Sequence, residues 1–490
     1  MNMVQFNIDL CQKYCSIQFI PYTCKEKKNM NIFEQLILPL FSFIFFITLL
    51  QKWRSIAFRQ AENLPPSPKG LPVIGNLHQL GNSPHRSLHS LSRRYNSHDL
   101  LLLRFGRARV LLVSSAITAR EVMKNQDEIF SNRPKLSMPD RLMYGSRSVA
   151  FTAYGEYWRQ VRSICVIHLL SNKRVQSFRA IREQETSIMV DKIRRESRSS
   201  SPVINLSNLL ASVTNDVICR VALASYSVPR AGGEYIPWFG WITRVNGLDS
   251  KVERVAKQFD EFLENVVREH KDRGRKHEDL DLVDILLELR MQSFKSGSLP
   301  IEDDTIKALI LNVFAAGSET TSIAIEWAMA ELIKNPRTMK TVQNEVRRVA
   351  RSKKEIVEDD LEKMPYLKAV LKEALRLHPP GPLLVPRECT HDTKVMGYDV
   401  LAGTRVLINA WAIARDRIHG KIPKNFDLRG SLTQELTLSD GILRLAKLVY
   451  HFNFALPNGE KEEDLDMSED EGFTVHKRLP LLVVPTLYEM

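Results

Sequence analysis

The sequence predicts a mainly α-helical protein with a minor β portion, set behind an N-terminal membrane anchor. Two observations carry this prediction. Apolar residues recur at helical spacing through several long segments, whereas the patterns typical of strands are confined to short pairs. A strongly apolar run from Leu36 to Leu50 approaches the roughly 20 residues that a bilayer-spanning helix needs. With 490 residues, 44% of them hydrophobic, the chain is long enough to bury a large core.

The net charge of +12 does not indicate nucleic-acid binding. Lys and Arg are interleaved with Asp and Glu, as in residues 268–273, and no stripe of basic and aromatic residues appears. We therefore expect no nucleic-acid partner. A solvated basic surface is the simplest interpretation, and an anionic membrane face or an acidic redox partner are the alternatives.

The six cysteines show no paired spacing. Cys11 and Cys15 are four residues apart, but no second pair completes a zinc site. Free thiols in a reducing compartment are therefore expected.

We interpret residues 32–50 as a transmembrane signal anchor, because no small-residue cleavage site follows them. A buried core helix is the alternative. The basic residues Lys52, Arg54 and Arg59 predict that the following domain is cytoplasmic, but basic residues at 25–28 blur this asymmetry. The conflict disappears if translation begins at Met30, which would make residues 1–29, most of the segment 1–31 ahead of the anchor, a spurious extension.

Residues 51–76 combine a basic stop with a proline-rich segment, in which LPPSPKGLPVIGN spans 64–76. Closely spaced prolines favour a stiff, extended chain. In residues 77–490, Leu100–Leu103 and Val110–Val113 predict two strands with Gly106 between them. Strands are also expected between Gly397 and Asn409, with Ala402-Gly403 in the turn, and at Phe473–Val475 and Leu481–Val484 near the C-terminus.

Trp158 and Arg162 lie four residues apart and share one helical face. A surface cation–π pair is the plain interpretation of this spacing.

A long helix from Asp304 to Ile333 is interrupted by Ala316-Gly317-Ser318-Glu319-Thr320-Thr321. Glycine within a helix costs about 1 kcal/mol relative to alanine, and threonine hydroxyls compete for backbone carbonyls. The helix is therefore expected to loosen here, either as a simple kink or to make room for a ligand. Asn335-Pro336 should end it.

A second helix, Tyr366 to His378, carries Glu373 and Arg376 three residues apart. Such a pair is common on surfaces. Here it is followed by HPPGP at 378–382, then Leu383, Leu384, Val385 and Pro386-Arg387.

In this order and spacing, these motifs resemble the plant microsomal cytochrome P450 family over about residues 64–416. The resemblance implies a P450-like fold and a haem cofactor. It gives Glu319 and Thr320 the delivery of protons to bound dioxygen, and Glu373 and Arg376 a structural role. Trp158, Arg162 and Arg387 would hold the haem propionates, and Ala316, Leu383, Leu384 and Val385 would line the substrate pocket.

The resemblance fails at two places, where the chain is expected to have lost segments, near 224–234 and 430–441. The first normally carries a helix over the substrate pocket, and the second a glycine-rich loop whose cysteine ligates the haem iron. The last cysteine here is Cys389, ahead of that loop, so the metal ligand is missing. The remaining candidates by chemistry are His419, His451 and His476, but imidazole lacks the electron push of thiolate.

Two classes of function follow from the resemblance. The first is a monooxygenase that hydroxylates small apolar plant secondary metabolites, using O₂ and electrons that a flavoprotein reductase takes from NADPH. Such an enzyme is expected to be a monomer in the endoplasmic reticulum membrane, with its catalytic domain cytoplasmic. The second is an inactive remnant or a mis-assembled gene model without haem-thiolate chemistry. We expect the chain as written to be inactive, with haem binding in doubt. An unrelated helical membrane scaffold would leave the ordered motifs unexplained.

Overall fold

The computed structural model describes residues 40–48, 63–97, 99–200, 202–223, 248–272, 280–296, 300–351, 353, 355–416, 439–470 and 472–488. Residues 1–31, the expected deletion near 224–234 and residues 430–438 of the second one lie outside the described residues. The chain divides into two compact units, Met1–Gln60 and Ala61–Met490, and each is described by itself.

In the first unit, residues 40–48 form a helix. Its large apolar side chains are exposed, from 50% for Ile44 to 68% for Phe41. This helix covers only part of the predicted anchor, whose other residues lie outside the described ranges.

The second unit has a four-stranded sheet in the order β1-β2-β7-β4. Strands β1 (Leu100–Phe105) and β2 (Ala108–Val113) pair antiparallel around Gly106, whose φ of +59° suits glycine. Strand β7 (Arg405–Ile408) runs parallel to β2 and antiparallel to β4 (Arg387–Glu388). The predicted hairpin is therefore confirmed, and strands 300 residues further along extend its sheet.

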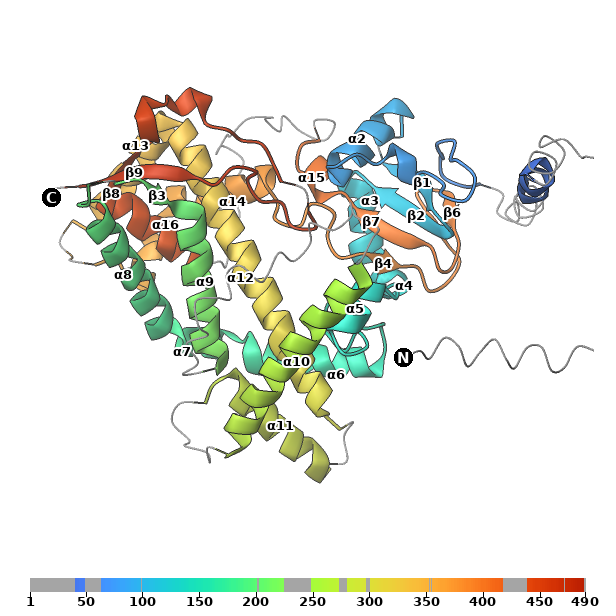
Figure 1. The fold of residues 1–490 in the computed structure, drawn as a ribbon, viewed down its shortest axis with the longest axis horizontal. Coiled ribbons are helices and arrows are strands. Elements are labelled where there is room, and N and C mark those ends of the chain that lie inside the picture. The colour runs from blue at the N-terminus through green and yellow to red at the C-terminus, as the bar shows by residue number, and fades with distance from the viewer. Residues whose placement is uncertain are drawn as a thin grey trace, which may run out of the picture. The chain divides into compact units, whose positions relative to one another are not determined.

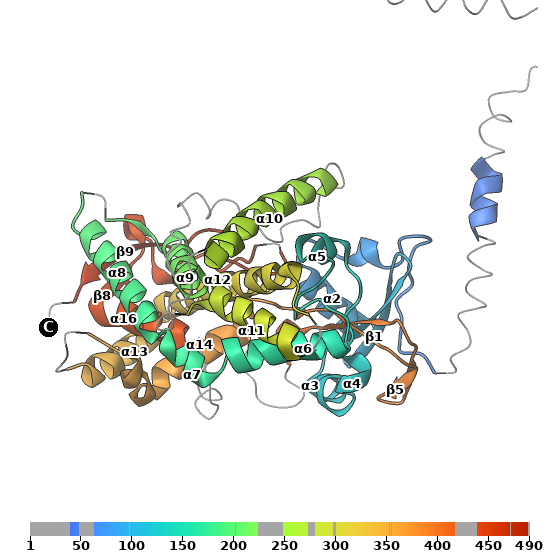
Figure 2. The same ribbon diagram turned by 90° about the horizontal axis from the view of Figure 1, so that it is seen from below.

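Helices make up most of the second unit (Figures 1 and 2). The longest, α12 (Asp303–Lys334), runs across the unit, with the four-stranded sheet on one side and α8, α9 and α16 on the other (Figure 1). The bounds of its packing neighbours are α8 (Arg179–Glu196), α9 (Leu206–Leu223), α13 (Pro336–Val349), α14 (Pro365–Leu377) and α16 (Ser439–His451).

Shorter helices surround this core. They are α2 (Pro84–Arg94), α3 (Ala116–Arg120), α4 (Asp127–Phe130), α5 (Ser137–Leu142), α6 (Glu156–Ile164), α7 (Asn172–Ser177), α10 (Leu248–Asp272), α11 (Leu282–Ser296) and α15 (Ala410–Ile413). Single π turns, η4 (Glu121–Asn125) and η5 (Cys165–Leu169), continue α3 and α6. Short 3₁₀ turns are η3 (Leu77–Gln79), η7 (Glu358–Lys363), η9 (Pro457–Gly459) and η10 (Glu462–Asp464).

The main hydrophobic core lies between α12, α14 and α16. Trp327 of α12 is fully buried there, and Leu371 of α14 and Leu445 of α16 belong to the same cluster. Among the described residues, α12 is the one helix long and apolar enough to cross a membrane. Its C-terminal half is buried in this core and residues 306–311 are buried in a second cluster with α10 and α11, so we assign it as a core helix. It ends at Lys334, and Pro336 opens α13, as the sequence predicts.

One strand prediction needs correction. Residues Phe473–Val475 form no strand, although Val475 donates to the Pro380 carbonyl over 2.9 Å. The last strand, β9 (Leu482–Leu487), pairs with β8 (Phe452–Ala455) and β3 (Ile204–Asn205). The strand, turn and strand predicted between Gly397 and Asn409 are confirmed as β6 (Tyr398–Val400), a turn at 402–403 and β7, and β6 pairs with β5 (Thr393–Val395).

Candidate active site

The middle of α12 is open, although both of its ends are buried. Residues 305–311 and 322–333 are buried, whereas residues 312–321 are not, and Ala316 is exposed. Ten residues of α-helix span about 15 Å. This opening contains the whole motif from Ala316 to Thr321, so the polar and small residues mark a surface that the folded chain does not cover.

Hydroxyl groups in this motif bond back to their own helix. Thr320 Oγ1 donates to the Ala316 carbonyl over 2.5 Å, and Ser318 Oγ donates to the Phe314 carbonyl over 2.6 Å. Such bonds compete with the backbone ladder and bend helices. Gly317 adds to the effect, because a Cβ at this position would lie 2.8 Å from Ile218 Cδ1 on α9. Helix α12 is nevertheless a continuous helix from Asp303 to Lys334, so the predicted loosening is not seen, and the close approach of α9 accounts for the glycine.

The carboxylate of Glu319 points to the C-terminal segment. Its Oε1 accepts hydrogen bonds from Thr474 Oγ1 over 2.9 Å and from His476 Nε2 over 2.7 Å. Burial acts to lower the pKa of His476, but the pairing with Glu319 outweighs it and the pKa is raised. Glu319 and Thr320 are adjacent, but no hydrogen bond between their side chains is present in the described structure. Their proposed cooperation in proton delivery stays a prediction.

A cavity of about 270 Å³ lies between α12, α14 and the start of α16. Apolar side chains dominate its wall, and the two threonines of the α12 motif supply the polar part. The lining residues are Thr320, Thr321, Ala324, Leu371, Leu375, Pro380, Gly381 and Gly441.

The residues predicted to line a substrate pocket are not among those that form this cavity. Ala316 is exposed on α12, and Leu383 packs against the cluster beneath the four-stranded sheet. Leu384 is 36% exposed and adopts a φ of +53°. Val385 offers its carbonyl to Arg133 Nη1 over 3.0 Å.

Trp158 and Arg162 lie together on α6, as their spacing predicts. The guanidinium of Arg162 is 5.0 Å from the centre of the Trp158 ring, and it is exposed. Trp158 is half-buried, and its Nε1–H donates to the Val149 carbonyl over 3.0 Å. The indole N–H is thus already used, whereas the guanidinium remains accessible to an anion.

Arg387 is paired in this structure. Its Nη1 donates to Asp127 Oδ1 over 2.7 Å. Beside it lies Arg133, a half-buried arginine that the sequence analysis did not single out. Arg133 donates to the Val385 and Pro386 carbonyls, while its buried Nε has no partner. Burial and repulsion from Arg387 lower the pKa of Arg133 to about 10, so an anion bound here would relieve both effects.

Glu373 and Arg376 form a buried pair on α14. Arg376 Nε and Nη2 donate to the two oxygens of Glu373 over 2.8 and 2.7 Å, and Nη1 donates to the Ala414 carbonyl over 2.7 Å. The Glu373 side chain is 1% exposed. The pair therefore ties α14 to the end of α15 and is more than a surface contact.

The described cysteines are poor candidates for an iron ligand. Cys165, Cys219 and Cys389 are buried and free. Burial raises the pKa of Cys165 and Cys389 to about 11 and that of Cys219 to about 12, so each is a neutral thiol near neutral pH. The other three cysteines precede residue 25, outside the described residues.

The three histidines considered as alternative ligands are also poor candidates to ligate the iron. His476 is bonded to Glu319. His451 ends α16, ten residues or about 15 Å from Gly441 at the cavity, and His419 lies outside the described residues. The guanidinium groups fit the anionic edge of a haem, but the donor atoms of the described residues do not fit a thiolate-ligated iron.

Sequence reasoning missed three residues of this site, namely Arg133, Thr474 and His476 as a partner of Glu319. Each acts through a contact with a segment more than 150 residues away. A pattern of neighbouring residues in the sequence cannot predict contacts over such separations.

Comparisons with known proteins agree on one family. A sequence model described as "Cytochrome P450" matches residues 65–228 and 235–429. The chain is 51% identical to cytochrome P450 71A6 of Nepeta racemosa, over 90% of this chain and 97% of that protein. It is 46% identical to (+)-menthofuran synthase of Mentha piperita, over 91% and 97% of the two chains.

A solved structure shares the fold. A solved structure of a zebrafish cytochrome P450 with abiraterone superposes with a TM-score of 0.71 at 25% identity, and the match covers 84% of this chain and all of that one.

Proposed function

The chain belongs to the cytochrome P450 family, and on that premise we propose that it derives from a haem monooxygenase of plant secondary metabolism. We further propose that, with the sequence it has, it does not hydroxylate a substrate. It keeps the helices that surround the haem in this family but lacks the cysteine that would ligate the iron. Haem supplies oxygen activation in the family, and thiolate ligation favours cleavage of the O–O bond.

The observation that carries this proposal is that the chain offers no cysteine thiolate that could ligate a haem iron beside α12. No cysteine follows Cys389 in the sequence, and Cys389 is a buried thiol that donates to the His391 carbonyl over 2.9 Å. The family match also ends at residue 429, just before the expected loop. The alignment with the Nepeta racemosa relative spans 500 residues but only 90% of this 490-residue chain. The relative therefore has stretches without a counterpart here.

Small apolar metabolites are the substrate class that the lineage supports. Relatives include (+)-menthofuran synthase and a 3-beta-hydroxylase of Tanacetum parthenium, the latter 44% identical over 93% of this chain. The described cavity is apolar apart from two threonines, which is consistent with this class. In a family member that keeps its iron ligand, the residues equivalent to Glu319 and Thr320 would hold a proton and pass it on. The residue equivalent to His476, which here is partly exposed and bonded to Glu319, would return a proton to the carboxylate.

The partners and location follow from the same lineage. We propose that the protein is a monomer anchored in the endoplasmic reticulum membrane by residues 32–50. Its catalytic domain would lie on the cytoplasmic side. Electrons would come from NADPH only through a flavoprotein reductase. The net charge of +12 supports an acidic partner.

A mis-assembled gene model is the alternative that the expected deletions favour. Sequencing the transcript across residues 415–456 separates the two cases. A longer message that restores a glycine-rich loop with a cysteine would make the natural protein a working monooxygenase. A message that matches the printed sequence would mean that the cell makes the protein without its iron ligand.

The test of the protein as printed is the spectrum of its reduced, carbon-monoxide-treated form. The full chain is expressed with added haem precursor, and haem content is measured separately by the pyridine haemochrome method. We expect no red-shifted carbon-monoxide band, with (+)-menthofuran synthase prepared in parallel as the positive control. A red-shifted band from this chain would refute the proposal, because only a thiolate ligand produces it.

A further inference from the structure

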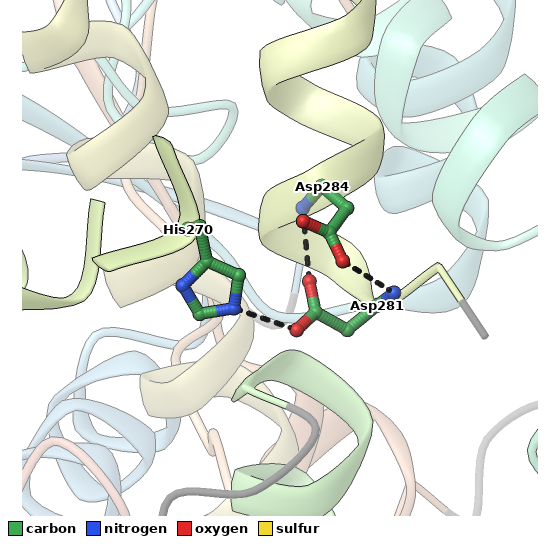
Figure 3. Close-up of side chains that lie close together, drawn as sticks. All are labelled: His270, Asp281 and Asp284. Carbon is green, nitrogen blue, oxygen red and sulfur yellow. Dashed lines mark hydrogen bonds and ion pairs between the residues drawn. The ribbon is translucent and has the colours of Figure 1, made fainter. Parts of the chain in front are cut away.

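A cluster of one histidine and two aspartates lies away from the open middle of α12. His270 is in the last turn of α10, Asp281 directly precedes α11, and Asp284 is in the first turn of α11 (Figure 3). One nitrogen of His270 and one oxygen of each carboxylate lie within 4.8 Å of one another. The three side chains converge from two helices whose connection, residues 273–279, lies outside the described residues.

The imidazole of His270 is oriented as a metal ligand would be. Its Nδ1 is 2.7 Å from the Val266 carbonyl, which can only accept, so Nδ1 carries a proton. Its Nε2 then faces Asp281 Oδ2 over 2.7 Å. Histidines that bind metals characteristically donate their other ring N–H to a backbone carbonyl or carboxylate. Burial acts to lower the pKa of His270, but the hydrogen bond to Asp281 outweighs it and the pKa is raised, so a proton on Nε2 is held against the carboxylate. A metal ion would take the place of that proton.

The two aspartates cap α11 but do not use all their oxygens in doing so. The Asp284 backbone N–H donates to Asp281 Oδ1 over 2.9 Å, and the Asp281 N–H is 3.4 Å from Asp284 Oδ2 (Figure 3). This reciprocal arrangement is a helix capping box. The cap uses Oδ1 of Asp281 and Oδ2 of Asp284, and the other Asp281 oxygen faces His270. The cap and a cation that replaces the proton on His270 Nε2 are therefore compatible.

The charge of the cluster also calls for a cation. The side chains of His270 and Asp281 are 1% and 3% exposed. Within the described ranges, no lysine or arginine pairs with Asp281 or Asp284, so two carboxylates share one imidazole. Burial and the neighbouring Asp281 raise the pKa of Asp284, which shows that the negative charge is crowded. Buried charges are ordinarily paired or bound to metals.

We propose that His270, Asp281 and Asp284 bind a Zn²⁺ ion, with water as the fourth ligand. One nitrogen and two oxygens suit Zn²⁺, whereas Mg²⁺ and Ca²⁺ favour all-oxygen sites. Bonds of about 2.0–2.1 Å in a tetrahedron place ligand atoms about 3.3 Å apart. Binding the ion would lengthen the distance between His270 Nε2 and Asp281 Oδ2 from 2.7 Å by about half an ångström. The ion would fasten the end of α10 to the start of α11, both of which pack on α12.

The test uses the full chain in detergent, stripped with a chelator and dialysed against ZnCl₂. Bound zinc per chain is measured for the wild type, for His270→Ala and for Asp284→Asn. The matched control is Asp272→Asn, an exposed carboxylate on α10 outside the cluster. We expect the first two variants to lose one equivalent of zinc, or to bind it at least tenfold more weakly, and the control to match the wild type. Asp284→Asn keeps an oxygen for the cap, and far-UV circular dichroism verifies that each variant is folded.

Two results would overturn the proposal. Equal zinc binding by the wild type and both ligand variants would show that the cation in the cluster is a proton on His270. Equal displacement of zinc by MgCl₂ would show that the site does not select its nitrogen ligand. Neither readout requires haem, so this test is independent of the activity of the protein.

Discussion

The pair formed by Glu373 and Arg376 gives the sharpest prediction about stability. Arg376 supplies two charge-assisted hydrogen bonds to a carboxylate whose side chain is 1% exposed, and a third bond to the Ala414 carbonyl. Arg376→Met would remove these bonds and leave the carboxylate in a buried position. Removing one partner of a buried ion pair costs about 3–5 kcal/mol. We expect the free energy of unfolding to fall by that amount.

The chain contains a matched control for this experiment. Asp191 and Arg194 also lie three residues apart on a helix, and their closest atoms are 2.6 Å apart, but their side chains are 62% and 36% exposed. Exposed pairs contribute about 0–1 kcal/mol, because solvent screens them. Arg194→Met is therefore expected to change the free energy of unfolding by less than about 1 kcal/mol.

The assay is urea unfolding of the full chain in detergent, followed by tryptophan fluorescence. The double variant Glu373→Leu, Arg376→Met is measured as well, because removing both charges should cost less than removing the arginine alone. Equal losses from Arg376→Met and Arg194→Met would show that burial does not decide the strength of these pairs. The reasoning about the site would then fail.

Two further predictions concern a turn and a histidine. Gly75 has a φ of +65°, and a Cβ there would lie 2.1 Å from the Arg104 carbonyl oxygen, so Gly75→Ala should cost more than about 3 kcal/mol in urea unfolding. Gly106 has a similar φ of +59° with open space around it, so Gly106→Ala should cost only about 1 kcal/mol, and equal costs would contradict the clash. Burial, followed by repulsion from basic neighbours, lowers the pKa of His451 to about 4, below its ordinary 6.5. The folded state then binds fewer protons between these values. Stability should fall by about 1–2 kcal/mol from pH 7 to pH 5, and His451→Gln should reduce that fall; an unchanged pH dependence would refute the assignment.

The sequence predicted the helices well because their signals are local. The apolar spacing of α12 and α14, and the Asn335-Pro336 stop, are properties of contiguous residues, and the structure matches them within about one residue. The burial of Glu373 could not be read from its spacing to Arg376, because Asp191 and Arg194 have the same spacing at the surface. Its burial was expected only from the family resemblance.

Non-local contacts explain what the sequence did not reveal. Residues Phe473–Val475 have the apolar and β-branched content of a strand, but Thr474 bonds to Glu319 and Val475 bonds to Pro380 and Trp327. These partners take the hydrogen bonds that a neighbouring strand would need. The same contacts hold the carboxylate of Glu319, so one segment accounts for both a wrong strand and a missed neighbour of the site.

The loss of the iron ligand and the survival of the fold are compatible, because different residues encode them. The core that holds α12, α14 and α16 together consists of apolar side chains such as Trp327, Leu371 and Leu445, which carry no metal-ligating atoms. A Cβ at Gly441, at the start of α16, would lie 3.6 Å from Leu371 Cδ2 on α14. The helix that follows the missing loop therefore still packs closely against α14. Burial of this core stabilises the scaffold without a contribution from the ligand. A chain can therefore match its family over most of its length and still lack the atom on which the family's chemistry depends.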